Sequence, residues 1–196
     1  MSATELPLFP LGTVLMPDGP LMLRIFEPRY LDMIGRCMRN ETGFVVVLIH
    51  NGGETGPATF NKVGTLAKIA DWHQYDDGVL GITALGQSRV RVHESHRQTD
   101  GLNVGQVEFI APDPAIVLPE KYGYLARLLE QLIDQLVDQY ALVDVNYGDA
   151  GWVSSRLAEI LPLPNERKQT CLELEQPLAR IELIAEVVRE MTKRDS

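Results

Sequence analysis

The spacing of the apolar residues changes once along this chain, near residue 115. Before that point, apolar side chains alternate with polar ones or form short β-branched runs, which is typical of strands. After it they recur three and four positions apart, which is typical of amphipathic helices. Strands followed by helices indicate the α+β class. We therefore predict a β-rich subdomain over residues 1–114 and a helical bundle over residues 115–196.

The β-rich part contains a strong hairpin signal. The runs Val63–Tyr75 and Val79–His93 flank an Asp-Asp-Gly turn at residues 76–78, and Asp-Gly between strand-like runs favours a hairpin. Phe44–Ile49 is a continuous apolar run, as expected of a strand buried on both faces. Gly105–Ala111 has the composition of one more strand.

One helix is predicted among these strands. Pro28 stands in its first turn, and Tyr30, Ile34 and Met38 follow at helical spacing. Gly43 follows the end of the pattern, and proline at the start with glycine after the end is the usual asymmetry of helices.

Four helices are predicted in the second part. The first begins at Pro119 and carries a wide apolar stripe as far as Tyr140, and the second ends before Pro162. The third spans about 165–172, and the last begins at Pro177.

The composition restricts the class of partner and the compartment. The 196 residues include 18 Lys and Arg against 27 Asp and Glu, a net charge of -9, which argues against a protein that neutralises phosphates along a nucleic acid. No apolar run approaches the roughly 20 residues that a membrane helix needs, and the first residues do not resemble a signal peptide. We expect a cytoplasmic protein, whose Cys37 and Cys171 are reduced thiols in the core.

The sequence contains none of the common catalytic motifs. No glycine is followed by lysine, as a phosphate-binding loop requires, and neither G-x-G-x-x-G nor G-x-S-x-G occurs. Two cysteines cannot supply a Cys-rich zinc site, and His93 and His96, three apart in a strand, face opposite sides. We expect no enzyme activity, no catalytic residue, no cofactor and no metal site.

Several stretches, taken together and in order, resemble the N-terminal domain of Lon protease, also called the LON substrate-binding domain. They cover nearly the whole chain: Leu6–Leu11, Leu21–Ile25 running into Phe26–Tyr30, Val63–Ile69, Asp77-Gly78, Gly86–Val92, Arg156–Ala158, Leu161–Leu163, Lys168-Gln169 and Leu172-Glu173. The family usually has an aromatic residue where Val90 stands.

The resemblance implies a partly open β-barrel of the PUA-like type followed by a helical bundle. In the full protease this domain captures substrates and aids assembly, whereas catalysis lies in AAA+ and protease modules. The chain therefore resembles a free-standing LON domain, in the manner of a small bacterial cytosolic protein. It would bind exposed apolar protein segments or one specific protein partner, without a membrane, and the sequence leaves open whether it forms homo-oligomers.

Aromatic side chains near the ends of the predicted elements are the candidate binding residues, because interfaces depend on a few aromatic anchors. They are Phe26, Tyr30, Trp72, Tyr75 and Trp152. We expect them to line an apolar groove between the barrel and the bundle. Trp72 and Trp152 are the preferred candidates, since tryptophan is rarely fully buried.

Charged residues give two further hypotheses. Glu27 and Arg29, at the junction of a strand and a helix, are predicted to form a structural ion pair. Arg89 and Arg91 alternate with Val90 and Val92, and Arg97 follows in the same run, which predicts a solvated basic face. PUA-like barrels, which the resemblance implies, often bind RNA, so RNA binding by this face is the alternative function, and an unrecognised hydrolase is a third.

Overall fold

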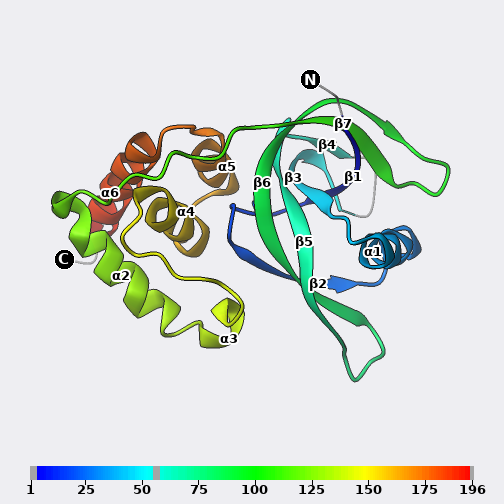
Figure 1. The fold of residues 1–196 in the computed structure, drawn as a ribbon, viewed down its shortest axis with the longest axis horizontal. Coiled ribbons are helices and arrows are strands. Elements are labelled where there is room, and N and C mark those ends of the chain that lie inside the picture. Colours follow the sequence, from blue (N-terminus) through cyan, green and yellow to red (C-terminus); the bar gives the residue numbers. More distant parts are fainter. Residues whose placement is uncertain (1–3, 55–57, 195–196) are drawn as a thin grey trace. The chain divides into compact units, whose positions relative to one another are not determined.

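The computed structural model describes residues 4–54 and 58–194 of the chain. The chain divides into two compact units, Met1–Ala111 and Pro112–Ser196, whereas the sequence predicts the division after residue 114. The first unit holds the strands and one helix, and the second holds the remaining helices (Figure 1). The α+β class expected from the sequence is confirmed.

The barrel unit is built from strands and one helix in the order β1 (Thr4–Leu11), β2 (Pro20–Ile25), α1 (Pro28–Asn40), β3 (Phe44–Gly52), β4 (Ala58–Phe60), β5 (Val63–Gln74), β6 (Leu80–Arg97) and β7 (Asn103–Phe109). Neighbouring strands follow the order β1-β7-β6-β5-β3, and a parallel pairing of β1 with β3 closes the ring. β2 pairs with the first part of β6 and β4 with the end of β3.

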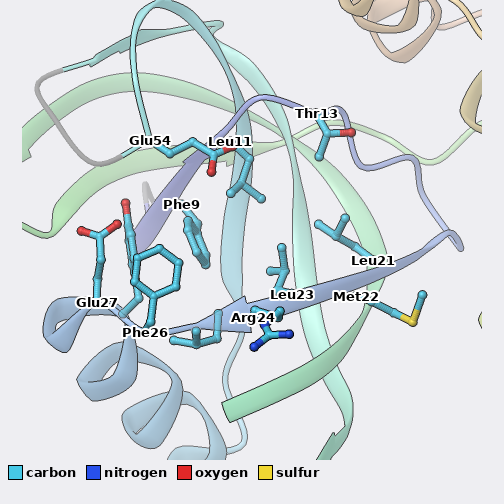
Figure 2. Close-up of a pocket in the computed structure, with 12 residues that line it drawn as sticks. Phe9, Leu11, Thr13, Leu21, Met22, Leu23, Arg24, Phe26, Glu27 and Glu54 are labelled. Carbon is cyan, nitrogen blue, oxygen red and sulfur yellow. The ribbon is translucent and has the colours of Figure 1, made fainter. Parts of the chain in front are cut away.

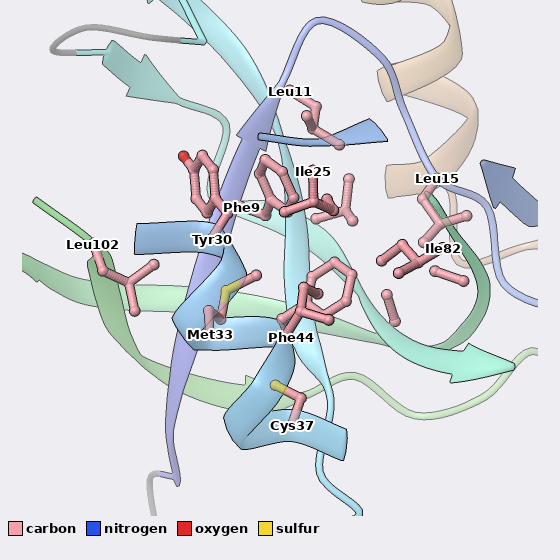
Figure 3. Close-up of a cluster of buried hydrophobic side chains, with 14 of the residues drawn as sticks. Phe9, Leu11, Leu15, Ile25, Tyr30, Met33, Cys37, Phe44, Ile82 and Leu102 are labelled. Atoms are coloured by element: carbon pink, nitrogen blue, oxygen red, sulfur yellow. The ribbon is translucent and has the colours of Figure 1, made fainter. Parts of the chain in front are cut away.

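The predicted buried strand is confirmed, since β3 contributes to two hydrophobic clusters. Phe44 and Val46 belong to the larger cluster, together with side chains of α1 (Figure 3). Val45 and Val47 belong to a second cluster of valines and leucines on the other face. Successive side chains of a strand point to opposite faces, so a strand buried on both must be apolar throughout.

The helix predicted at Pro28 is α1, and its end differs from the expectation in one respect. The left-handed residue after the helix is Glu41, with φ 53°, rather than a glycine. Gly43 is required for another reason: a Cβ there would lie 2.4 Å from the carbonyl oxygen of Ala67. Close approach of two backbones, and not capping, therefore explains this glycine.

The predicted hairpin joins β5 and β6 and is confirmed. Gly78 has φ 81°, which suits glycine, and the Asp77 carboxylate accepts a hydrogen bond from the Val79 N–H at 3.1 Å. Arg24 of β2 forms an ion pair with Asp77 and lies 4.2 Å from the centre of the Tyr75 ring. The hairpin and β2 are thus tied together.

The helical unit contains η1 (Glu120–Tyr122), α2 (Gly123–Ile133), α3 (Val137–Tyr140), α4 (Ala150–Ile160), α5 (Asn165–Glu173) and α6 (Pro177–Arg194). The single helix predicted from Pro119 to Tyr140 is wrong. The N–H groups of Gln135 and Leu136 donate three residues back, to Leu132 and Ile133, which ends α2 in a tight turn. After this break, Tyr140 is buried and donates a hydrogen bond to the Glu159 carboxylate.

A buried arginine connects the segments of the helical unit. Arg180 of α6 donates to Ser154 Oγ at 3.0 Å and to the carbonyl oxygens of Cys171 and Leu174 at 3.3 and 3.2 Å, and it pairs with Asp113. Since a buried guanidinium needs such partners, this contact network specifies how α4, α5 and α6 pack. Among the described helices, none is both long and apolar enough to cross a membrane.

Candidate functional site

The barrel unit contains a pocket of about 240 Å³ beside the junction of β2 and α1 (Figure 2). We call it the Phe26 pocket. Its walls come from β1 and the segment after it, from β2, from the start of α1 and from one side chain after β3. The lining residues are Phe9, Leu11, Thr13, Leu21, Met22, Leu23, Arg24, Ile25, Phe26, Glu27, Tyr30 and Glu54.

The floor of the pocket is an aromatic stack. Phe9 of β1 and Tyr30 of α1 lie with ring centroids 3.9 Å apart and planes at 21°, and Phe9 also contacts Phe44 at 5.8 Å. Tyr30, predicted as a contact residue, is thus a buried member of the core. Burial raises the pKa of its hydroxyl, against the opposing charge of Arg29, so Tyr30 is neutral at physiological pH.

The rim of the pocket carries an exposed aromatic side chain. Phe26, one of the predicted contact residues, is 65% exposed although it adjoins the core. Leu21 and Leu23 extend from β2 toward Leu11 and Thr13, whereas Arg24 lies on the other side of the strand (Figure 2). Phe26 thus lines the hollow together with Leu21, Met22 and Leu23, and a contiguous apolar surface with polar residues around it marks an interaction site.

The wall near α1 is fixed by an arginine. Arg29 Nη2 lies 2.8 Å from the Glu27 carboxylate, and the guanidinium donates to the carbonyl oxygens of Gly101 and Glu54 at 2.9 and 3.1 Å. The Glu54 carboxylate accepts a hydrogen bond from the Gly12 N–H at 2.7 Å. The predicted partners Glu27 and Arg29 therefore do meet, and they connect the start of α1 to two loops.

The other two aromatic candidates of the barrel unit lie on the hairpin. Trp72 is 57% exposed and lines a separate hollow of about 480 Å³ with Met38 and Lys68. Tyr75 is half-buried and packs edge-on against His73, with ring centroids 4.5 Å apart. Neither side chain lines the Phe26 pocket.

Trp152 corrects an expectation, because it is only 8% exposed. It lies in the first turn of α4, where its N–H donates to the Asp149 carboxylate at 2.7 Å, and its ring meets Tyr147 edge-on. Trp152 therefore belongs to the core of the helical unit, because the first turn of α4 is buried and capped by Asp149. The predicted groove between the barrel and the bundle stays a prediction.

Arg89 also corrects an expectation, because it does not lie on a solvated face. It is 4% exposed and donates to the carbonyl oxygen of Ala111. The register with β5 is even from Arg89 to Arg91, so Arg89 keeps its place in the alternation, and the segment after β7 contacts its guanidinium at Ala111. Arg91 and Arg97 are exposed, and Arg97 donates to the Gly101 carbonyl oxygen, so the predicted basic face loses Arg89 alone.

Both cysteines are buried and form no disulfide, and burial raises the pKa of both thiols. Within residues 4–54 and 58–194, no group of three or more His, Cys, Asp or Glu side chains is arranged to hold a metal ion.

Most of the residues that line the Phe26 pocket are not predicted as contact residues from the sequence. The sequence predicts Phe26 and Tyr30 as contact residues but does not single out Phe9, Leu21 or Leu23, although Leu21 and Leu23 alternate with Met22 as residues on one face of a strand do. Glu54 lies in a glycine-rich loop with no local pattern that could have identified it.

The fold of nearly the whole chain is similar to solved structures of Lon N-terminal domains. The chain is similar to a Lon N-terminal domain protein from Xanthomonas campestris, whose crystal structure matches with a TM-score of 0.78 and 36% identity over 93% of this chain and 98% of that chain. It is also similar to the N-terminal domain of the Mycobacterium avium complex Lon protease, with a TM-score of 0.59 over 93% and 97% of the two chains; at 13% identity this likeness concerns the fold alone.

Curated relatives match over part of the chain. Cereblon from Danio rerio is 30% identical over 125 residues, which are 60% of this chain and 29% of cereblon. Cereblon from Xenopus tropicalis is 25% identical over 119 residues, 60% of this chain and 26% of that protein. The match thus spans less than a third of the length of these relatives. Residues 5–190 match the ATP-dependent protease La (LON) substrate-binding domain, and the chain belongs to that family.

Proposed function

We propose that this chain binds a segment of another polypeptide in the Phe26 pocket and catalyses no reaction on it. The observation that carries the proposal is the 65% exposure of Phe26 on the rim of a pocket whose floor is apolar. Membership of a substrate-binding family supports the same function.

The size of the pocket favours a side chain over a free small molecule. Its volume of about 240 Å³ is below the roughly 300–1,000 Å³ of typical small-molecule sites. A peptide can insert one or two apolar side chains there while Phe26 covers them. Binding through a few apolar anchors tolerates many sequences, which suits the capture of unfolded segments.

The experiment is a titration with reduced and alkylated lysozyme, a basic polypeptide that stays unfolded, carrying a fluorescent label and followed by anisotropy. We expect saturable binding that Phe26→Ala weakens by about tenfold or more, as for a central aromatic anchor. Phe109→Ala is the matched control, because Phe109 is another exposed phenylalanine, at 48%, on a strand of the same unit outside the pocket. Equal affinities of the two variants contradict the assignment to this pocket.

The same experiment tests the hairpin and the absence of catalysis. Trp72→Ala measures whether the second hollow contributes to the affinity for lysozyme, and we expect a smaller loss of affinity than with Phe26→Ala.

The absence of catalysis is tested on the recovered lysozyme, which is analysed by mass spectrometry after incubation with and without ATP. We expect an intact polypeptide, and cleavage would contradict a purely binding function.

A further inference from the structure

One edge of strand β2 has no partner strand. Residues Pro20–Ile25 pair with Leu80–Leu85 of β6, and within the described part of the chain β2 pairs with no other strand. Further along the same edge of β6 lies β7, and β7 has a next neighbour in β1. The sheet therefore ends at β2, where backbone N–H and C=O groups point away from it.

The Phe26 pocket lies along this edge. Leu21 and Leu23 of β2 line it from one side, and Phe9 and Leu11 of β1 line it from the other. β1 pairs with β7 only over Thr4–Leu8, so its last residues leave a gap in the barrel opposite β2 (Figure 2). A peptide in the pocket therefore meets an open strand edge as well as apolar side chains.

Proteins usually protect such edges with a charged side chain, a proline or a covering loop. The charged residue of β2 is Arg24, but its guanidinium pairs with Asp77 and lies over Tyr75 of the hairpin. The proline is Pro20, at the first position of the strand. The stretch Leu21–Leu23 thus has neither form of protection.

The charges around the pocket favour a basic peptide. Glu27 is paired with Arg29. Glu54 accepts a hydrogen bond from the Gly12 N–H but forms no ion pair with any residue that the structure describes. A lysine or arginine of the ligand would balance this carboxylate.

We infer that an extended segment of a partner protein adds as a strand to the free edge of β2, inserts alternate apolar side chains into the Phe26 pocket and places a basic side chain near Glu54. This inference rests on the proposed function, and it adds the conformation and the chemical class of the ligand. Main-chain hydrogen bonds would supply affinity independent of sequence, and the pocket would select the apolar side chains.

The test uses short overlapping peptides that span lysozyme, of which the tightest-binding one is the probe. In an added strand, the N–H groups of alternate residues face the edge and the others face away. Two versions of the probe are made, with N-methyl groups on one alternating set of amides or on the other. We expect one version to bind about tenfold or more weakly than the probe, since it loses several hydrogen bonds, while the other binds nearly as well.

The outcomes separate the inference from the proposed function. If the probe binds and Phe26→Ala weakens it, but both methylated versions bind alike, the added strand is wrong and the binding function stands. If whole lysozyme binds but no short peptide does, the added strand is again contradicted. If nothing binds, both fail. Because the modification is in the peptide, misfolding of the protein cannot produce the result.

A second measurement tests the place and the charge. Amide hydrogen exchange of Leu21–Ile25 should slow when the probe binds, and an unchanged rate in the saturated complex would contradict pairing at β2.

The charge contact is tested with Glu54→Gln, which keeps an acceptor for the Gly12 N–H and removes the charge. We expect this variant to bind a lysine-containing probe several-fold more weakly than the wild type does. Its affinity for the same probe with norleucine in place of lysine should be unchanged. Equal effects on both probes would contradict the charge contact. Glu94→Gln, an exposed carboxylate of β6, is the control.

Discussion

Phe9 of β1 and Tyr30 of α1 stack with ring centroids 3.9 Å apart. This contact joins the first strand of the barrel to the helix that follows β2, and it forms the floor of the Phe26 pocket. The pocket is therefore continuous with the hydrophobic core, and its floor is as rigid as the core itself.

The stack makes a prediction about stability. Phe9→Leu keeps most of the buried volume but removes the aromatic pair, so we expect the free energy of unfolding to fall by about 1 kcal/mol. Tyr30→Phe keeps the stack, and we expect a change within about 0.5 kcal/mol. Urea denaturation of the three proteins checks this, and the reverse order of the two losses would contradict the importance of the ring contact.

The ion pair at the start of α1 makes a second prediction. Glu27→Ala leaves the nearly buried guanidinium of Arg29 without its carboxylate, although two backbone oxygens still accept from it. We expect a loss of about 1–3 kcal/mol of unfolding free energy. Glu27→Gln, which keeps an acceptor, should lose less. An unchanged denaturation midpoint for Glu27→Ala would show that the pair is not structural.

Gly86 positions β2 and gives a third prediction. Its N–H donates to the Gly19 carbonyl oxygen at 2.8 Å, and an added Cβ would lie 2.1 Å from the carbonyl oxygen of Met16. Gly86→Ala must therefore displace the turn before β2, at a cost of about 1–3 kcal/mol or more. Gly53→Ala is the control, because a Cβ there has no heavy atom within 4 Å. Similar thermal midpoints for the two variants would refute this explanation.

The helical unit contains a pH-sensitive carboxylate. Burial raises the pKa of Glu159 above its ordinary value of 4.5, although Arg156 at 3.3 Å, the Tyr140 hydroxyl and Lys168 oppose the shift. At pH values between the ordinary pKa and the raised one, the folded chain holds a proton that the unfolded chain has lost. The contribution of Glu159 to the free energy of unfolding is therefore fully present below its ordinary pKa. It is lost as the pH rises through the raised pKa of the folded state.

Glu159→Gln resembles the protonated carboxyl and measures this effect. The unfolding free energy of the wild type minus that of the variant should fall as pH rises from about 4 to about 7. The same difference for Glu182→Gln, an exposed carboxylate of α6, should stay constant. A difference for Glu159→Gln that is flat or rises with pH would show that the carboxyl is ionised throughout this range.

The elements that the sequence predicts correctly are those with local signals. Pro28 with its helical spacing, and Asp77-Gly78 between strand runs, predict α1 and the hairpin because a few neighbouring residues determine the backbone there. The sequence does not predict the break after Ile133, because the apolar spacing continues through it, whereas the contact of Tyr140 with Glu159 joins residues distant in sequence.

Exposure was harder to predict than secondary structure. Trp152 and Phe26 are both aromatic residues at the ends of elements, yet one is 8% and the other 65% exposed. Arg89 is buried, and the segment after β7 contacts its guanidinium at Ala111. Such outcomes depend on which segments meet in the fold, and spacing along one segment does not contain that information.

Binding of a polypeptide segment in the Phe26 pocket can be followed residue by residue. Chemical-shift mapping by NMR, with isotope-labelled protein and the tightest-binding lysozyme peptide, tests it most directly. We expect the largest amide shifts in residues 9–13, in 20–27 and at Glu54, and little change in the helical unit. Shifts confined to the helical unit or to the hollow around Trp72 would contradict binding in this pocket. So would an absence of shifts with the peptide if whole lysozyme binds the protein.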